Sequence, residues 1–336
     1  MKWANDHWTA RQHGAIYSDN GYALALTHSH AFVWQYAINI PSPETFTFAL
    51  PQTSKHASDP LPLGSLVSAS ASTSEPGLVV VFPSSGKITY WDTISSAATL
   101  DLIKVKSNGV SSLIPGMMAG ETVSQILNAE SAGFVLTFST GRLAYLRVRD
   151  GHGRPNISIQ FLRGSSGPLA GGIFGSLRNV LSSSAWRGDI AAVRAGPQEH
   201  VGERNVVVAT GKGRLQLWNL QRDGQNYLRS EAEGRESIVM AIKKAEPSLG
   251  DMLLETFEVL DLTFTPKSMI DDIDAPGAHL LLLTSLTSRR SSYYTLVNVV
   301  LNKDQLLVGN VRLLKSYTTP VNVHAISKPR LYLPEP

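Results

Sequence analysis

The chain has 336 residues, a formal net charge of +3 and a sequence pI of about 9.0. Hydrophobic residues make up 43% of it and charged residues 17%, which describes a globular protein able to bury a core. The mild charge argues against a nucleic-acid-binding protein, which would show clustered Lys and Arg. Because the chain has no cysteine, it has no disulfide, no Cys-based zinc site and no thiol nucleophile.

The N-terminal residues 1–14 lack the apolar core of a signal peptide. No run reaches the roughly 18 to 20 apolar residues of a transmembrane helix, and residues 280–283 form the densest short apolar patch. The lack of cysteine fits an intracellular protein without requiring one. We expect a protein that can touch a membrane but does not span it.

After a polar lead-in, residues 22–26 and 31–36 predict two strands around the polar turn 27–30. Residues 45–50 predict a further alternating strand. The stretch 51–77 is rich in Ser, Pro and Thr and predicts a loop, interrupted by a strand near residues 63–70.

Three hairpins then repeat one pattern, in which an apolar strand, a small-residue turn with Gly and a basic residue, and a second strand follow one another. Their strands are expected at residues 78–82 and 88–92, 134–138 and 143–146, and 206–209 and 215–219. The turn glycines Gly86, Gly141 and Gly213 would supply the positive φ of a tight hairpin. Aromatic residues such as Trp91 and Trp218 would pack between neighbouring sheets.

A recurring four-strand unit with such a central hairpin is typical of a β-propeller blade. Only Trp91-Asp92 matches the WD dipeptide, so we expect an irregular all-β propeller with short helical insertions between blades. Past residue 219 the pattern predicts helices at 236–245 and 249–256 and strands at 259–265, 279–284, 293–301 and 305–317. This gives about five blades and a fragment at 320–336: either the chain is an excerpt of a larger domain, or its N-terminal strands close the ring.

The candidate metal and phosphate motifs favour plain structural interpretations. His28-x-His30 has ligand-like spacing but no further ligands nearby, so a polar turn is favoured over a metal site. Residues 271–274 lack the Gly and distal Glu of a calcium loop. Residues 211–213 are a hairpin turn and not a Walker loop. We predict no metal site and no cofactor.

The sequence also shows no catalytic motif. No GxSxG elbow or Ser/His/Asp arrangement stands out, although a triad assembled across blades would be invisible in sequence. The basic pairs Arg147-x-Arg149 and Arg289-Arg290 predict solvated side chains. We therefore expect neither an enzyme nor a small-molecule substrate.

The stretch 165–186, SSGPLAGGIFGSLRNVLSSSAW, differs from the rest of the chain. At about 100° per residue its large apolar side chains fall within an arc of roughly 140°; these are Leu169, Ile173, Phe174, Leu177, Val180 and Leu181. The opposite face is Gly, Ser and Asn with one charge, Arg178. Trp186 lies off the stripe, so a helix would end near Ser184.

Gly and Ser are poor helix formers, so this stretch would be helical only where something accepts its apolar face. We predict an inter-blade loop that folds on a membrane surface through the six apolar residues. A Ser/Gly linker and a helix docked on the propeller remain alternatives. Its GxxxG, Gly171 and Gly175, lies in too short an apolar run for a membrane dimer.

Four features follow one another along the chain: residues 21–25 running into residues 33–36, the strand 45–50 preceded by prolines, the hairpin 86–92 and the stretch 165–186. In this order they resemble the N-terminal propeller of the nucleoporin 133/155 family, nearest its outer-ring (Y-complex) scaffold members. The similarity extends over essentially the whole chain. The resemblance implies a seven-bladed propeller that faces the nuclear envelope and is followed by an α-helical stack lying outside this sequence.

From this resemblance we expect residues 1–336 to form one propeller domain of a nuclear pore scaffold protein, located in the nucleus at the pore and serving transport, including mRNA export. Its partners would be the curved nuclear envelope and other scaffold nucleoporins, with no direct nucleic acid contact. The alternative is a soluble protein-interaction propeller of a coat or regulatory complex, with 165–186 as a passive linker. An enzymatic propeller is a more distant alternative.

Overall fold

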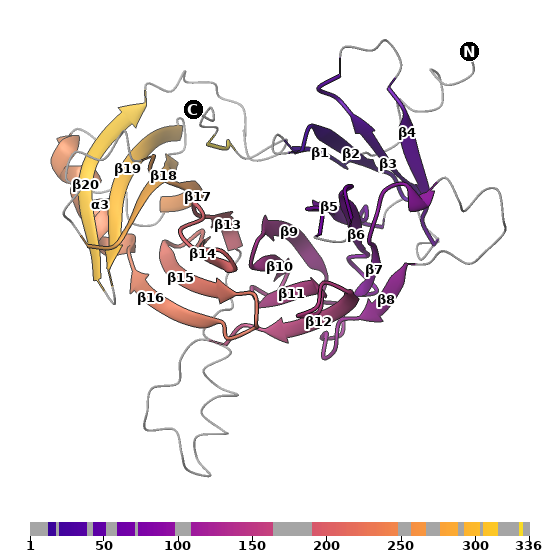
Figure 1. Cartoon of the computed structure of the whole chain (residues 1–336). Helices are drawn as coiled ribbons and strands as arrows, with labels where there is room; N and C mark the ends of the chain where they lie inside the picture. Colours follow the sequence, from indigo (N-terminus) through magenta and orange to yellow (C-terminus); the bar gives the residue numbers. More distant parts are fainter. Residues whose placement is uncertain are drawn as a thin grey trace, which may run out of the picture. The chain divides into compact units, whose positions relative to one another are not determined.

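The computed structural model describes residues 13–17, 20–38, 43–51, 59–70, 73–97, 109–163, 190–247, 257–266, 276–287, 292–302, 305–314 and 329–331. Within them the chain forms five four-stranded sheets, each with its strands in sequence order and antiparallel to their neighbours (Figure 1). The predicted all-β class and the five predicted blades are thereby confirmed. No helix in this described part is long and apolar enough to cross a membrane.

The chain divides into two compact units, Met1–Phe161 and Leu162–Pro336. The first unit holds three sheets. Their strands are β1 (His13–Tyr17), β2 (Tyr22–Leu26), β3 (His30–Gln35) and β4 (Thr45–Ala49); β5 (Leu63–Val67), β6 (Gly77–Val81), β7 (Lys87–Trp91) and β8 (Val110–Leu113); and β9 (Val123–Ala129), β10 (Gly133–Phe138), β11 (Leu143–Arg149) and β12 (Pro155–Phe161).

The second unit holds two sheets and a helix. These are β13 (Ile190–Ala195), β14 (Glu203–Thr210), β15 (Arg214–Gln221) and β16 (Tyr227–Glu233); the helix α3 (Arg235–Ala245); and β17 (Phe257–Phe264), β18 (Ala278–Thr287), β19 (Ser292–Asn302) and β20 (Gln305–Leu314). The predicted helix at 236–245 is confirmed, while the predicted helix at 249–256 lies outside the described residues.

The predicted hairpins are the central strand pairs of the sheets. The register pairs Val79 with Tyr90, Val135 with Tyr145 and Val207 with Leu217. The turn glycines have the predicted positive φ, +65° at Gly86, +84° at Gly141 and +90° at Gly213. At Gly86 a side chain would also meet the Met117 sulfur, so the turn excludes one for two reasons.

The first and last strands of several sheets were not predicted. Residues 13–17 form β1, so the expectation of a polar lead-in there is wrong. The last strands β8 and β12 are mostly half-exposed or exposed, and their sequences VSSL and PNISIQF lack an apolar run. Edge strands such as these are held by backbone pairing to a buried neighbour, which leaves little trace in hydrophobicity.

In the first unit, neighbouring sheets pack face to face through two apolar clusters. One joins the first two sheets and includes Leu24, Phe48 and Trp91, with the rings of Phe48 and Trp91 5.0 Å apart. The other joins the second and third sheets and includes Tyr90 and Phe134. The predicted packing of Trp91 between sheets is confirmed.

The second unit has one large apolar cluster between its two sheets, and α3 belongs to it. Ile238, Val239 and Ile242 are the buried residues of this helix. They lie in the same cluster as Leu217 of β15 and Leu282 of β18. The predicted apolar face of α3 therefore packs as a side wall of this core.

Candidate functional site

The six residues predicted to bind a membrane lie outside the described residues, as does the whole stretch 165–186. The described chain shows what flanks them. The stretch follows β12, the last strand of one sheet, and precedes β13, the first strand of the next.

The strand that enters this stretch is held at its end by aromatic and cationic contacts. The Phe161 ring lies 5.4 Å from the Phe138 ring, and the Arg142 guanidinium stacks 4.1 Å from the centre of the Phe161 ring. The last residue of β12 is therefore anchored on the third sheet.

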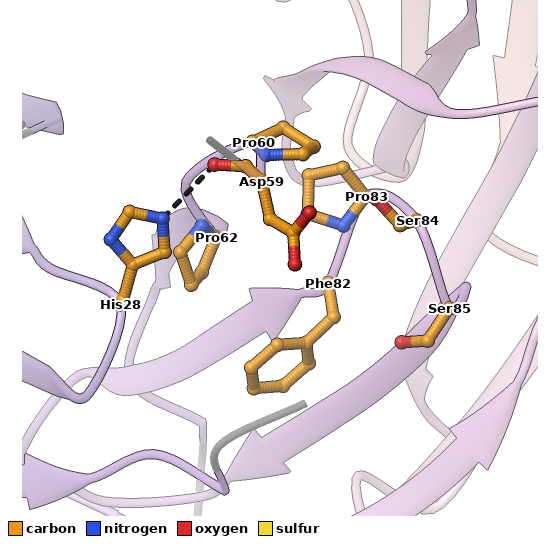
Figure 2. Close-up of a pocket in the computed structure, with 8 residues that line it drawn as sticks. All are labelled: His28, Asp59, Pro60, Pro62, Phe82, Pro83, Ser84 and Ser85. Carbon is orange, nitrogen blue, oxygen red and sulfur yellow. Dashed lines mark hydrogen bonds between the residues drawn. The ribbon is translucent and has the colours of Figure 1, made fainter. Parts of the chain in front are cut away.

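One surface hollow of about 180 Å³ opens in the first unit between the turns of its first two sheets (Figure 2). Its lining residues are His28, Asp59, Pro60, Pro62, Phe82, Pro83, Ser84 and Ser85. His28 Nε2 donates a hydrogen bond of 3.0 Å to the Asp59 carbonyl oxygen, which joins the β2–β3 turn to the segment before β5. Small-molecule sites usually enclose about 300 to 1,000 Å³, so this hollow has room for about one side chain.

The two histidines of the predicted polar turn have separate partners. His28 bonds the Asp59 carbonyl, whereas His30 Nδ1 lies 2.8 Å from the Ser29 hydroxyl and its ring stacks 5.9 Å from Phe32. Among the described residues no three His, Cys, Asp or Glu side chains gather as a metal-binding group. The acidic residues 271–274 lie outside the described part.

Arg149 is not the solvated residue that the sequence predicted. Its side chain is 12% exposed and forms an ion pair of 2.9 Å with Asp92, while Nη1 donates to the Ser68 carbonyl at 2.7 Å. Asp92 also accepts a 2.5 Å hydrogen bond from the Tyr90 hydroxyl. These contacts join the third sheet to the second, and the partners are too distant in sequence for spacing to reveal them. Arg289 and Arg290 lie outside the described residues.

Glu121 is a buried carboxylate in the first unit that the sequence did not single out. It accepts hydrogen bonds from Arg142, with Nε at 2.9 Å, from the Thr140 hydroxyl and from the Met118 amide at 3.0 Å. Burial alone would raise the pKa of Glu121, but the hydrogen bonds from Arg142, Thr140 and Met118 outweigh burial and hold this pKa below its ordinary value. The cluster fixes the loop before β9 against the β10–β11 turn.

Asp261 is the corresponding buried carboxylate of the second unit. Arg194 Nη2 donates to both of its oxygens, at 2.7 and 2.9 Å. The amides of Leu262 and Leu331 donate to it at 2.8 and 2.9 Å. One carboxylate thereby joins β13, β17 and the chain after β20.

In both clusters arginine and amide donors take up the lone pairs of the carboxylate. A general base would need a free lone pair facing a substrate. The geometry of Glu121 and Asp261 therefore indicates structural roles.

Comparison with known proteins assigns the family. The family model described as Nup133 N-terminal-like matches residues 3–336. This chain belongs to the Nup133 N-terminal-like nucleoporin family. It is 49% identical to the nucleoporin NUP133 of Chaetomium thermophilum over 98% of its own length, and 27% identical to the nucleoporin nup132 of Schizosaccharomyces pombe over 79%. The predicted resemblance is confirmed.

This nucleoporin chain spans about a quarter of the length of those two relatives, 25% and 22%. Among solved structures it is similar to the Nup133 β-propeller domain of Vanderwaltozyma polyspora, with a TM-score of 0.68 and 20% identity over 94% of this chain and 72% of that one. It is also similar to the N-terminal domain of Chaetomium thermophilum Nup170 in its complex with Nup53, with a TM-score of 0.51 and 12% identity over 95% and 41%. The fold is thus an irregular β-propeller fold, as predicted.

Proposed function

We propose that this chain is the propeller part of a nuclear pore scaffold protein and that it contacts the curved nuclear envelope through the stretch 165–186. The scaffold role is supported by membership of the Nup133 N-terminal-like family and by the propeller fold. The membrane contact is supported by one observation, the six large apolar side chains on one face of a Gly- and Ser-rich helix pattern.

The energetics favour a curved surface over a flat one. Six such side chains entering lipid gain on the order of 9 to 18 kcal/mol. Ordering about 16 residues costs a similar amount before helical hydrogen bonds form. Because the two amounts nearly cancel, stable binding needs lipid-packing defects, which curved membranes supply.

Vesicle flotation of the purified chain tests the membrane contact, with phosphatidylcholine vesicles of about 50 nm and about 400 nm diameter. We expect Leu177→Asp to abolish binding to the small vesicles and to leave the weak binding to large ones little changed. Asn179→Asp adds the same charge on the opposite face of the helix pattern and should bind nearly as the wild type does. Equal binding of wild type and Leu177→Asp would reject the membrane role.

A second candidate is a protein-interaction propeller in which 165–186 is a passive linker. The similarity to the Nup170 domain, which was solved with Nup53 bound, favours this candidate at the level of the fold. Deleting residues 165–186 would then leave localisation at the nuclear envelope and the co-purification of other scaffold nucleoporins unchanged. Loss of envelope localisation with partners retained would favour the membrane role.

We also propose that residues 1–336 form one propeller domain without a catalytic site, cofactor, small-molecule substrate or direct nucleic acid contact. The same antiparallel four-strand unit recurs from β1 to β20, which supports one repeating architecture for both units. The net charge of +3 supports protein and membrane partners over nucleic acid.

A further inference from the structure

The connection between β8 and β9 exposes large apolar side chains in an uncharged segment. Residues 113–120, LIPGMMAG, are called the apolar loop below. Leu113 is 64% exposed and Met118 is 55% exposed, and every other exposed residue of the loop is Pro, Ala or Gly. From residue 110 to residue 120 the chain has no Asp, Glu, Lys, Arg or His. Scattered exposed apolar residues are common on protein surfaces, whereas a continuous apolar segment indicates a binding surface.

The inner side of the apolar loop is bonded to the Glu121 cluster. Arg142 Nη2 donates a hydrogen bond of 3.0 Å to the Gly116 carbonyl oxygen. The Met118 amide donates to the Glu121 carboxylate at 3.0 Å, and the Met118 carbonyl accepts from the Glu121 amide at 3.1 Å. These backbone groups therefore have partners inside the protein, so an apolar environment outside the loop would leave none of them unpaired.

The outer side of the apolar loop stands clear of the rest of the described chain. A side chain at Gly116 or Gly120 would meet no atom within 4 Å. Ile114, by contrast, is buried, and its amide donates to the Gly86 carbonyl at 2.9 Å. The loop thus presents Leu113 and Met118 on a backbone that is already folded, so binding through them requires little further ordering.

Arg142 connects the apolar loop to the end of β12. Its guanidinium donates to the Gly116 carbonyl and also stacks 4.1 Å from the centre of the Phe161 ring. Phe161 is the last residue of β12, and Ser165 follows four residues later in the chain. Because four residues extend over at most about 14 Å, a membrane that binds residues 165–186 would come close to the apolar loop.

We propose that the apolar loop is a second membrane contact, and that Leu113 and Met118 insert into the same lipid surface as residues 165–186. This inference rests on the membrane contact proposed above. The two contacts differ in kind, because the Gly- and Ser-rich stretch must pay for ordering on the membrane and the apolar loop is folded beforehand. They should strengthen each other, since the second contact forms within a complex that the first has already made.

A lipid surface fits the apolar loop better than a protein partner does. Protein interfaces carry about one hydrogen bond per 100 to 200 Å². The apolar loop has no polar side chain, and the backbone groups of Gly116 and Met118 are already bonded. Lys87 pairs with Leu113 in the β7–β8 register, so its ammonium group would reach lipid phosphates while its alkyl stem stays beside the leucine.

A fluorescent label at a single position tests the proposal. The chain has no cysteine, so Met118→Cys provides one attachment point for an environment-sensitive dye. With phosphatidylcholine vesicles of about 50 nm diameter we expect a blue shift of its emission and protection from aqueous iodide. His152→Cys is the matched control, because His152 is exposed in the β11–β12 turn at the opposite end of the third sheet and should show neither change.

A substitution measures how much the apolar loop contributes to binding. Leu113→Ser combined with Met118→Ser should lower the partition coefficient onto the same vesicles roughly 5- to 50-fold. Met240→Ser is the control, since Met240 is 68% exposed on α3, and it should change the coefficient less than about twofold. Thermal unfolding of each variant checks that the exposed substitutions leave the fold intact.

Three results would overturn the proposal and separate it from the role of residues 165–186. If vesicles bind the wild type but not Leu177→Asp, and the label at residue 118 stays in water, the apolar loop is no membrane contact and the proposed function stands. If the wild type does not bind vesicles and the label does not respond, both are rejected. If the label responds to other scaffold nucleoporins and not to vesicles, the apolar loop is a protein-docking site.

Discussion

Two buried carboxylates, Glu121 in the unit of residues 1–161 and Asp261 in the unit of residues 162–336, are stabilised by partners at very different sequence distances. Glu121 is 3% exposed and Asp261 is 1% exposed. Glu121 bonds Met118, Thr140 and Arg142, all within its own and the next hairpin connection. Asp261 bonds Arg194 and Leu331, each in a distant part of its unit.

The difference separates a local clamp from a long-range one. Breaking the Glu121 cluster frees the loop between β8 and β9, while the two sheets that this loop connects keep their strand pairing. Breaking the Asp261 cluster releases β13 from β17 and removes the anchor of the chain after β20. Although Glu121 and Asp261 are similarly buried and similarly bonded, removing Asp261 should therefore lower the free energy of unfolding more than removing Glu121.

Asp261→Ala should have the largest effect. It leaves the Arg194 guanidinium and the Leu331 amide without their acceptor, and losing one member of a buried pair costs about 3 to 5 kcal/mol. Arg194 is 28% exposed and can regain water, so we expect about 3 kcal/mol in the free energy of unfolding. Urea denaturation measures the total, and hydrogen exchange by mass spectrometry shows where it falls.

The exchange should accelerate in peptides from β13, β17 and residues 329–331, while β9 to β11 keep wild-type protection. Asp223→Ala is the control, because Asp223 is exposed in the β15–β16 turn, where its side chain accepts a hydrogen bond from the nearby Gln225 amide. Uniform acceleration over both units would contradict a clamp confined to the second unit.

The central hairpins of this fold were predictable because they are buried on both faces and carry apolar runs around a glycine turn. β6 and β10 are buried at every position, and the turn glycines 86 and 141 have the φ values that the pattern required. The edge strands β1, β8 and β12 were not predictable from their own sequences. Backbone hydrogen bonds to the neighbouring strand hold them in place, and such pairing does not depend on which side chains they carry.

The clamps were beyond sequence reasoning for a related reason. Arg149 and Asp92 are far apart in the chain, and only the packing of two sheets brings them into contact. From the sequence alone, an isolated pair of arginines predicts solvated side chains. Asp261 interrupts an apolar strand, Phe257–Phe264, and that interruption is the one signal that could have marked it. The residues from Leu169 to Leu181 were singled out by periodicity, and their membrane role stays a prediction.

Glu121→Gln should have an intermediate effect that depends on pH. The pKa of Glu121 is lower in the folded chain than its ordinary value of 4.5, so its charge stabilises the fold above that value. This contribution is lost as the pH falls through the lower, folded pKa. We expect Glu121→Gln to cost about 1 to 3 kcal/mol near pH 7 and to approach wild-type stability as the pH falls through the folded pKa of Glu121.

Thermal unfolding over this pH range measures the difference. Glu44→Gln makes the same change at an exposed position of the first unit and should follow the wild type at every pH. A stability deficit of Glu121→Gln that stayed constant as the pH fell would show that the side chain acts through packing and not through its charge.

Replacing Arg142 or Arg194 by lysine should lower the free energy of unfolding least. Of these two substitutions, the one in the Glu121 cluster should have the larger effect. Lysine keeps the charge but loses the planar, two-pronged donor. Arg142 also stacks 4.1 Å from the Phe161 ring and 5.5 Å from the Phe138 ring, whereas Arg194 donates to Asp261 and to the Val193 carbonyl. We expect Arg142→Lys to cost about 1 to 2 kcal/mol and Arg194→Lys about 0.5 to 1 kcal/mol.

A double-mutant cycle of Arg142→Lys with Phe161→Leu isolates the ring contact, which should account for about 0.5 to 1 kcal/mol of the difference. The order of the two clusters reverses for a physical reason. The stability lost on removing a carboxylate depends on how many chain segments that carboxylate holds together. The stability lost on replacing an arginine by lysine depends on the other contacts that the arginine makes. If Arg194→Lys instead costs more than Arg142→Lys, the hydrogen bonds from Arg194 Nη2 to both oxygens of Asp261 dominate, and stacking on Phe161 contributes little to the Glu121 cluster.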